Sequence, residues 1–323
     1  MTSSGELARV AALRGLFARD TPGVRVGIGD DAAVLEASGA GALVWTVDAQ
    51  VEGTHFRTEW VSWHDVGWRS FMAAASDLAA MGAEPVAALS ALVLAPSIDD
   101  EALDAIARGQ AAASDEVGAP VVGGNLARGT ETSITTTLLG RAVAPVLRSG
   151  ARPGDRLWLA GPVGLAGAGL ALLEQDALSQ DALLQDAGAA TCVRAWRRPA
   201  ARIAEGRALA GVAHAAIDIS DGLAHDAWQL AEASHVRLVL DLAAVLAAGG
   251  EALVAGSALI ARDPADFALH GGEDYALLAA SATALPGFVE IGIVEAPGGG
   301  ARVLMKTARG TVPVEPRGFE HFA

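Results

Sequence analysis

The sequence contains one cysteine, Cys192, and one lysine, Lys306, among its 323 residues. A single cysteine excludes a disulfide framework and a thiolate metal cluster. The Walker loop pattern is absent, and a single lysine leaves no P-loop lysine and no Schiff-base lysine. The sequence also lacks a Gly-x-Ser-x-Gly elbow and a His-Glu-x-x-His pair, which excludes two further enzyme classes, the serine hydrolases and the zinc peptidases.

Positive charge is scarce as well. The chain has 23 lysine and arginine residues against 38 aspartates and glutamates, which gives a formal net charge of −15 at pH 7. Because like charges repel, this balance excludes a nucleic-acid backbone as the partner. An acidic protein still binds polyphosphates when divalent cations screen the two sets of negative charge.

Long uninterrupted apolar runs are missing too. The longest one, residues 157–173, contains four glycines and Pro162. This pattern is typical of a strand, a turn and a buried helix, and not of a membrane span. The N-terminal residues lack the layout of a signal peptide. We therefore expect a soluble, cytoplasmic protein with no membrane partner.

The order of the expected elements predicts an α+β (mixed α/β) fold. Apolar residues make up 52% of the chain, and strands alternate with helices in both halves. In the first half we expect strands at 43–51, 87–94 and 132–143 and helices at 64–83 and 99–117. The composition shifts at residues 148–155, Arg-Ser-Gly-Ala-Arg-Pro-Gly-Asp. This shift predicts an N-terminal sheet-and-helix domain over 1–147 and a C-terminal α/β domain over 148–323.

Pairs of acidic side chains recur where apolar segments end. Asp218 and Asp221 flank Ser220 after an apolar strand and before the glycine that starts a helical pattern. A strand that turns into a helix in this way directs oxygens and backbone N–H groups at one point. Similar acidic stretches occur at 27–31, 46–48 and 76–77. Clusters of hard oxygen ligands in apolar surroundings are what Mg²⁺ or Ca²⁺ requires.

Two further patterns favour phosphate chemistry. Asp77 is the only charge between residues 70 and 83 of a helix that is apolar nearly all round, and a metal ion is a suitable partner for it. The segment 120–129 predicts a strand that enters a glycine-rich turn at Gly123 and Gly124, where a backbone approaches phosphate closely. Without a P-loop lysine, phosphoryl transfer would depend on Mg²⁺ and arginine for charge neutralisation.

Seven motifs together resemble one known family. They are Gly-Ile-Gly-Asp-Asp, Val-Asp-x-x-Val-Glu-Gly-x-His-Phe, Ser-Asp-Leu-Ala-Ala-Met-Gly-Ala, Gly-Gly-Asn-x-x-Arg-Gly, Arg-Ser-Gly-Ala-x-Pro-Gly-Asp, Asp-Ile-Ser-Asp-Gly-Leu and Gly-Gly-Glu-Asp-Tyr, which begin at residues 27, 47, 76, 123, 148, 218 and 271. In this order they resemble the thiamine-monophosphate kinase family, over roughly residues 27–322. Single motifs are shared with the wider aminoimidazole-ribonucleotide-synthetase-like superfamily, whereas the combination is more specific.

The resemblance implies an activity and an assembly. It implies transfer of the γ-phosphoryl group of ATP to thiamine monophosphate, with several Mg²⁺ ions, to give thiamine diphosphate. It also implies a homodimer joined through the N-terminal sheets, with ATP near that interface. The N-terminal domain would then bind ATP and Mg²⁺ and dimerise, and the C-terminal domain would complete the phosphate and substrate site.

The resemblance also implies site residues. The metal ligands would be Asp30, Thr46, Asp48, Asp77, Asn125, Asp218 and Asp221. The contacts to ATP would be Gly124, Asn125, Arg148 and Ser220, and those to the thiamine end would be His55, Glu273 and Phe319. None of these residues acts as a nucleophile.

The chain departs from the family pattern at two positions. The family usually has aspartate where this chain has Asn125, and commonly a hydroxyl residue where it has Val47. Both positions resemble ligands of one metal, so we expect that metal site to be weak. Two other interpretations stay open: a related ATP-dependent synthetase, and a nucleotide-binding homologue that has lost turnover.

Overall fold

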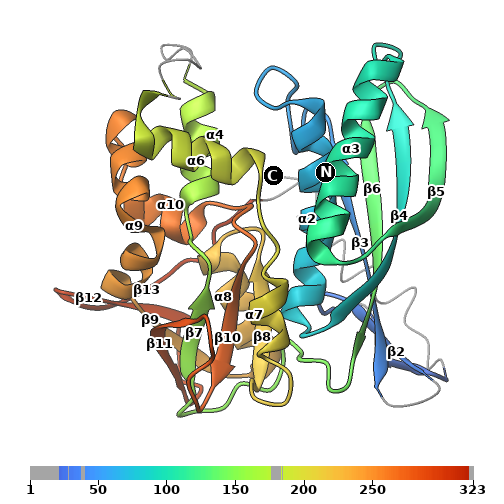
Figure 1. Ribbon diagram of the computed structural model, residues 1–323. Coiled ribbons are helices and arrows are strands. Elements are labelled where there is room, and N and C mark those ends of the chain that lie inside the picture. The colour runs from blue at the N-terminus through green and yellow to red at the C-terminus, as the bar shows by residue number, and fades with distance from the viewer. Residues whose placement is uncertain (1–21, 28, 38–40, 176–182, 184, 320–323) are drawn as a thin grey trace, which may run out of the picture.

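The computed structural model describes residues 22–27, 29–37, 41–175, 183 and 185–319. These residues form two halves, each built on one mixed β-sheet (Figure 1). The predicted mixed α/β architecture is thus confirmed. The family resemblance over residues 27–322 extends past the last described residue, 319.

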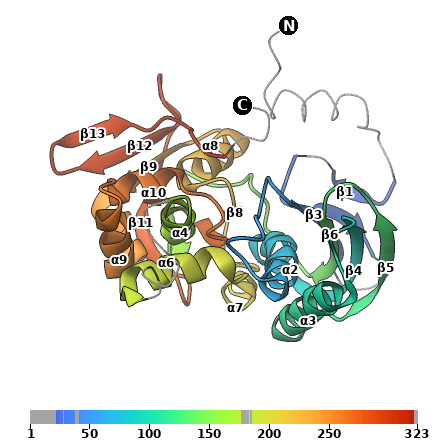
Figure 2. The same ribbon diagram turned by 90° about the horizontal axis from the view of Figure 1, so that it is seen from above.

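The N-terminal half is a six-stranded sheet with two helices on one face. The strand order is β1 (Val24–Val26), β2 (Ala33–Glu36), β3 (Ala42–Val51), β6 (Ser133–Ala142), β4 (Glu84–Leu94) and β5 (Val121–Arg128). Helices α2 (Trp63–Ala80) and α3 (Asp100–Val117) cover its inner face (Figure 2). The predicted strands and helices of this half are confirmed to within three residues at each end.

Strand β5 corrects one prediction. The segment around Gly123 and Gly124 does not form a turn, because β5 continues through both glycines to Arg128. It is the edge strand and pairs in parallel with β4, with Asn125 opposite Ala91. A β-carbon on Gly124 would lie 1.7 Å from the backbone oxygen of Ser90. This glycine therefore permits close strand pairing and does not mark a turn.

The C-terminal half is a seven-stranded sheet flanked by helices. Its strand order is β13 (Gly310–Pro313), β12 (Val303–Thr307), β9 (Arg237–Asp241), β11 (Val289–Glu295), β7 (Arg156–Ala160), β10 (Ala276–Ser281) and β8 (Ala215–Ile219). The helices are α4 (Leu165–Leu173), α6 (Ala187–Arg197), α7 (Ile203–Arg207), α8 (Leu223–Ser234), α9 (Leu242–Leu259) and α10 (Pro264–His270).

Helix α2 joins the two halves. Ser62 caps its N-terminus by accepting a hydrogen bond from the backbone N–H of Asp65. Its alanine-rich sequence presents small side chains, so other elements approach its backbone closely. Gly206 of α7 lies so near that a β-carbon there would be 2.4 Å from the oxygen of Ala79. In Figure 2, α2 lies between the N-terminal sheet and β8.

Among the described residues, one helix, α9, is long and apolar enough to cross a membrane by length and composition alone. Its backbone leaves the helical conformation at Gly250, where φ is 70° and ψ is −172°. The segment is therefore two short helices joined by a kink.

Candidate active site

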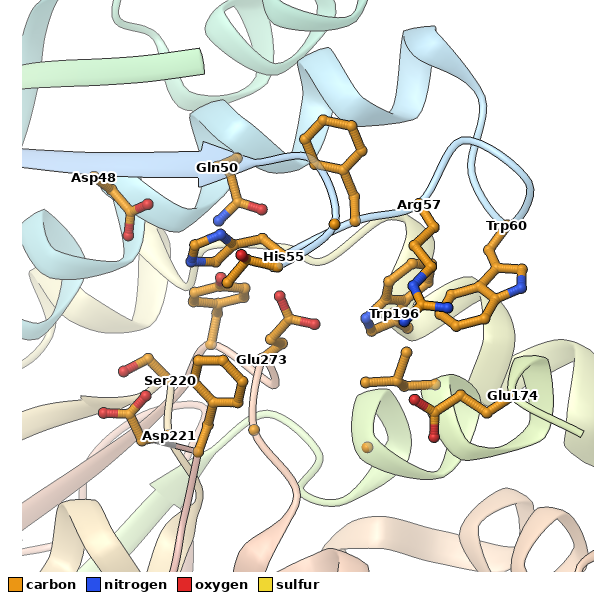
Figure 3. A pocket seen from close by; sticks show the side chains of 18 residues that line it. Asp48, Gln50, His55, Arg57, Trp60, Glu174, Trp196, Ser220, Asp221 and Glu273 are labelled. Atoms are coloured by element: carbon orange, nitrogen blue, oxygen red, sulfur yellow. The ribbon is translucent and has the colours of Figure 1, made fainter. Parts of the chain in front are cut away.

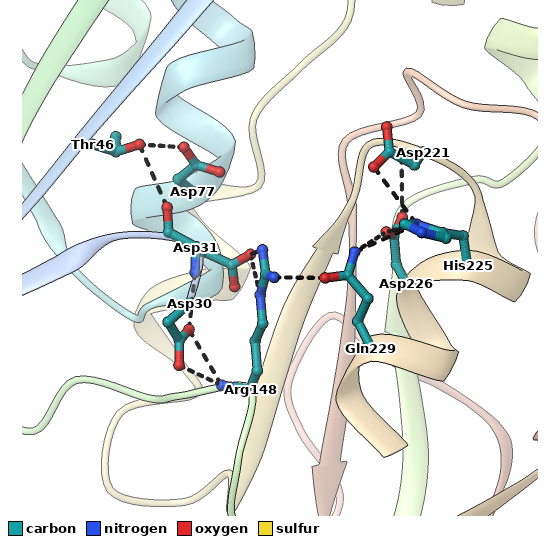
Figure 4. A network of polar contacts seen from close by, with 9 residues as sticks. All are labelled: Asp30, Asp31, Thr46, Asp77, Arg148, Asp221, His225, Asp226 and Gln229. Atoms are coloured by element: carbon teal, nitrogen blue, oxygen red, sulfur yellow. Dashed lines mark hydrogen bonds and ion pairs between the residues drawn. The ribbon is translucent and has the colours of Figure 1, made fainter. Parts of the chain in front are cut away.

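Three buried carboxylates meet where the two halves adjoin. Asp31 follows β1, Asp77 lies on the last turns of α2, and Asp218 lies in β8. One oxygen from each lies within 4.8 Å of the others. Thr46 of β3 donates a hydrogen bond to the carboxylate of Asp77. We call Asp31, Asp77 and Asp218 the carboxylate cluster. Figure 4 shows Asp31 and Asp77 together with Thr46.

Burial and mutual repulsion disfavour the charged forms of this cluster. Burial raises the pKa of Asp31 to about 6. The pKa values of Asp77 and Asp218 are raised well above the usual range, first by burial and then by the neighbouring carboxylates. Such an arrangement is costly in the folded protein unless a cation compensates it.

The cluster fits a hard divalent cation. One oxygen of Asp31, Oδ2, is buried and accepts no hydrogen bond from any residue that the structure describes. Its other oxygen accepts a 2.9 Å hydrogen bond from Nε of Arg148. A buried carboxylate oxygen with two further carboxylates beside it is the donor set that Mg²⁺ prefers.

Arg148 links this cluster to the C-terminal half. Its backbone N–H donates to Asp30 at 3.2 Å, and its Nη1 donates to Oε1 of Gln229 on α8 at 2.8 Å. Burial raises the pKa of Asp30 above its usual value. The guanidinium is half-buried, at 20% exposure of the side chain. An arginine held by two carboxylate-bearing segments is well placed to meet phosphate oxygens.

A second group lies at the start of α8. Asp221, His225 and Asp226 each bring one ligand atom within 4.8 Å of the others. Asp226 Oδ2 accepts hydrogen bonds from the backbone N–H of Asp221 and of Gly222, at 3.1 and 3.2 Å. Asp226 therefore fixes the turn that carries Asp221 and occupies donors at the helix N-terminus.

A pocket of about 300 Å³ opens beside these groups (Figure 3). Six predicted site residues line it, namely Asp48, His55, Ser220, Asp221, Glu273 and Phe319. The aromatic part of the wall is formed by Phe56, Trp60, Trp196 and Tyr275. Asp48, Ser220 and Asp221 lie on one side of the pocket, and Trp60 and Trp196 lie on the other together with Arg57 and Glu174 (Figure 3). This mixed lining of polar groups and rings suits an amphipathic ligand.

The ligand-facing side chains of this pocket are held in place. Nδ1 of His55 accepts a 3.1 Å hydrogen bond from the backbone N–H of Val51, so the neutral ring carries its hydrogen on Nε2. The rings of His55 and Phe319 lie 6.5 Å apart at 49°. Burial raises the pKa of Asp48 to about 6. The structure therefore brings together residues that the sequence separates by more than 260 positions.

Two predicted site residues, Gly124 and Asn125, lie on the edge strand β5 and do not reach the carboxylate cluster of the same chain. Asp48 pairs with Thr136 across β6, whereas Asn125 lies on β5, in the row of Ala91, Thr135 and Ala49. Three strand spacings of about 4.8 Å separate that row's two ends, roughly 14 Å along the sheet. Adjacent residues of a strand face opposite sides, so Asn125 and Ala49 face away from Asp48.

Val47, one of the two positions that resemble ligands of one metal, lies on the outer face of the sheet and is 62% exposed, whereas Thr46 is buried and contacts Asp77 of α2. Gly124 and Asn125 belong to the exposed edge strand. The departures at 47 and 125 are thus outside the carboxylate cluster of the same chain.

Sequence reasoning missed several residues of the site. The family resemblance assigns Asp30 and not Asp31, although the acidic pair in Gly-Ile-Gly-Asp-Asp is a signal for both. Asp226 and Gln229 lie on α8, five and eight residues after Asp221, with nothing in the sequence to set them apart from surface residues. The sequence likewise gives no sign that Arg69 of α2 differs from an exposed arginine, yet its side chain is buried.

The comparisons with known proteins agree with this geometry. The family model described as AIR synthase related protein, N-terminal domain, matches residues 29–142, and the one for the C-terminal domain matches residues 152–301. The fold and its buried carboxylates therefore define a protein of the AIR-synthase-related class.

Closer relatives narrow the class. A thiamine-monophosphate kinase of Mycobacterium tuberculosis is 37% identical over 287 residues, which cover 87% of this chain and 82% of that protein. One from Halobacterium salinarum is 35% identical over 285 residues, 85% and 90% of the two chains. A solved structure described as AaThiL complexed with AMPPCP and TMP superimposes with a TM-score of 0.85 at 29% identity, covering 98% and 97%. The chain belongs to the thiamine-monophosphate kinase family.

Proposed function

We propose that this chain transfers the γ-phosphoryl group of ATP to thiamine monophosphate, giving thiamine diphosphate and ADP. The observation that carries the proposal is the carboxylate cluster beside a pocket that is lined by both carboxylates and aromatic rings. Relatives over most of the chain are thiamine-monophosphate kinases, and the AaThiL structure holds an ATP analogue together with TMP.

Mg²⁺ is the cation that we propose for the acidic groups. Its ligands would come from the residues that offer carboxylate or hydroxyl oxygens here, namely Asp30, Asp31, Thr46, Asp48, Asp77, Asp218 and Asp221. When bound, such ions supply charge neutralisation for phosphate oxygens. Arg148 would contact ATP because its side chain lies against Asp31 of the cluster, and Ser220 would do so because it lines the pocket next to Asp221.

The residues position two phosphates and need not form a covalent intermediate. The phosphate of the acceptor is already ionised near pH 7, so it does not require a general base. His55, Glu273 and Phe319 would hold the thiamine end, which orients the acceptor phosphate toward the carboxylates. Positioning and charge stabilisation supply most of the catalysis in phosphoryl transfer. We therefore propose direct in-line attack.

We also propose a homodimer built on the outer face of the N-terminal sheet. Trp45, Val47 and Leu89 are 49%, 62% and 46% exposed on that sheet. A second copy covering this face would bury these side chains and place Asn125 and Gly124 at the interface, near ATP. Residues 1–147 would then bind ATP and Mg²⁺ and dimerise, while residues 148–323 would complete the substrate site. A cytoplasmic location agrees with the single cysteine.

Measuring ATP consumption with three acceptors tests the proposed reaction. Thiamine monophosphate, an aminoimidazole precursor and selenide are supplied separately with Mg²⁺ and ATP. We expect turnover with thiamine monophosphate alone. Consumption with either of the other acceptors would favour a related synthetase, and no consumption with any would favour a nucleotide-binding protein without turnover.

A further inference from the structure

Arg69 is a buried arginine with an unusual number of fixed contacts. It lies on α2, and its side chain is 1% exposed. Nε donates to Oε1 of Gln50 at 3.2 Å, and Nη1 donates to the backbone oxygen of Trp196 at 2.7 Å. Nη2 donates to Oε1 of Glu273. The guanidinium carbon also lies 4.5 Å from the ring centroid of Trp196.

These contacts surround the pocket without forming its wall. Gln50, Trp196 and Glu273 all line the pocket, whereas Arg69 lies behind them. Gln50 comes from β3, Trp196 from α6 and Glu273 from the loop before β10. One guanidinium thus fixes three wall residues from both halves of the chain. The planar fork of arginine makes these separate bonds simultaneously, as a lysine ammonium on a flexible stem does not.

Glu273 is held by its backbone as well. Its φ is 64°, a left-handed conformation that costs on the order of 1–2 kcal/mol for a residue with a β-carbon. Its N–H donates to the oxygen of Ser220 at 2.7 Å. The next carboxylate, Asp274, accepts from the N–H groups of Gly164 and Ala166, at 2.6 and 3.1 Å. Such strain persists only where the surroundings fix it, and here it directs Glu273 into the pocket (Figure 3).

We propose that Arg69 is a positioning residue for the thiamine end of the substrate, acting through Glu273. Arg69 holds one carboxylate oxygen, so that the negative charge of Glu273 faces a ligand in the pocket at a fixed angle. The thiazolium ring of thiamine monophosphate carries a permanent positive charge, which complements that carboxylate. This inference rests on the proposed function. It assigns Arg69 a role in the binding of thiamine monophosphate and none in the binding of ATP.

Steady-state kinetics of the wild type and four variants test this assignment. The variants are Arg69→Met, Arg69→Lys, Glu273→Gln and, as the matched control, Arg108→Met. The side chain of Arg108 on α3 is 74% exposed and pairs with Asp104 four residues before it, so this variant reports the effect of removing a guanidinium elsewhere.

The expected signature is a change in one Michaelis constant alone. Arg69→Met and Glu273→Gln should each raise KM for thiamine monophosphate by about tenfold or more and leave KM for ATP within about twofold. Arg69→Lys keeps the buried charge but loses the fork, so it should fall between Met and the wild type. Arg108→Met should match the wild type in both constants.

Combining the substitutions shows whether Arg69 acts through Glu273. In that case the double variant, Arg69→Met with Glu273→Gln, should be no worse toward thiamine monophosphate than Glu273→Gln alone. Three results would each overturn the proposal. The first is a double variant whose KM for thiamine monophosphate rises by the product of the two single effects. The others are a parallel rise of both Michaelis constants and an unchanged KM for thiamine monophosphate in Glu273→Gln. The last test needs no change at Arg69, so it decides even if Arg69→Met does not fold. A wild type inactive toward thiamine monophosphate would instead refute the proposed function.

Discussion

At the scale of single residues, the site is a collection of carboxylates held where they are costly. Asp218 is 4% exposed and lies beside Asp31 and Asp77. The sequence predicted this feature in kind, because an aspartate inside an apolar helix or strand requires compensation. It did not predict which of two adjacent aspartates joins the cluster, because that depends on where the turn after β1 directs each side chain.

Replacing Asp77 by asparagine should separate stability from function. The substitution removes one negative charge from the cluster and keeps an acceptor for the hydroxyl of Thr46. Without ligands, the variant should unfold at the same or a higher temperature than the wild type, because repulsion is relieved. The stabilisation by Mg²⁺ and ATP, and the turnover, should both be lost. Thermal melts with and without these ligands measure it, and an earlier melt of the unliganded variant would assign Asp77 a structural role.

The pH dependence of stability follows from the same cluster. In the folded state the pKa of Asp31 is about 6 and those of Asp77 and Asp218 are raised further, whereas an unfolded aspartate titrates near 4. The folded state therefore binds protons more tightly, and metal-free stability should fall as pH rises from about 4 to 6 and above.

Denaturant unfolding in EDTA across pH 4.5–8 checks this slope, with Asp77→Asn expected to flatten it. A wild-type stability that increases steadily over this range would contradict the cause we assign.

At the scale of elements, the pattern of apolar and polar residues predicted most of the helices and strands of the N-terminal half. The sequence predicted helices α2 and α3, strands β3, β4 and β6, and the strand–turn–helix around Asp218. Strand β5 was anticipated only up to Gly123, because paired glycines usually interrupt a strand. Here Gly124 is required by the approach of β4, and a single sequence carries no record of that neighbour.

The two glycines of β5 should therefore respond differently to alanine. A β-carbon at Gly124 would overlap the backbone oxygen of Ser90, so Gly124→Ala should destabilise the protein by about 1–3 kcal/mol. At Gly123 the nearest atom is a side-chain carbon of Leu89 at 3.4 Å, so Gly123→Ala serves as the matched control and should be nearly neutral. Urea unfolding of both variants compares them. Equal losses would indicate that the glycines are needed for backbone flexibility instead.

At the scale of the whole molecule, the site exists only because two halves meet. Thr46 and Asp77 come from the N-terminal half, and Ser220, Asp221 and Glu273 come from the C-terminal half. The family resemblance identified these residues as site residues from their sequence motifs. Their distances could not be predicted, because they depend on how closely α7, β8 and β10 pack against α2.

The outer face of the N-terminal sheet carries a separate expectation. If a second copy covers it, Val47→Arg should convert a dimer into a monomer, because a charge would be buried in the interface without a partner. Val289→Arg is the matched control, since Val289 is 52% exposed on β11 of the other half. Light scattering after size-exclusion chromatography measures the mass. A wild-type protein with the mass of one chain would contradict the dimer.

The central claim is that this chain phosphorylates a phosphate group of thiamine monophosphate with ATP. Phosphorus NMR of the wild type with ATP, Mg²⁺ and thiamine monophosphate tests it most directly. We predict the paired resonances of thiamine diphosphate growing in step with ADP while the signal of thiamine monophosphate declines. Release of inorganic phosphate from ATP with the thiamine monophosphate signal unchanged would contradict the account.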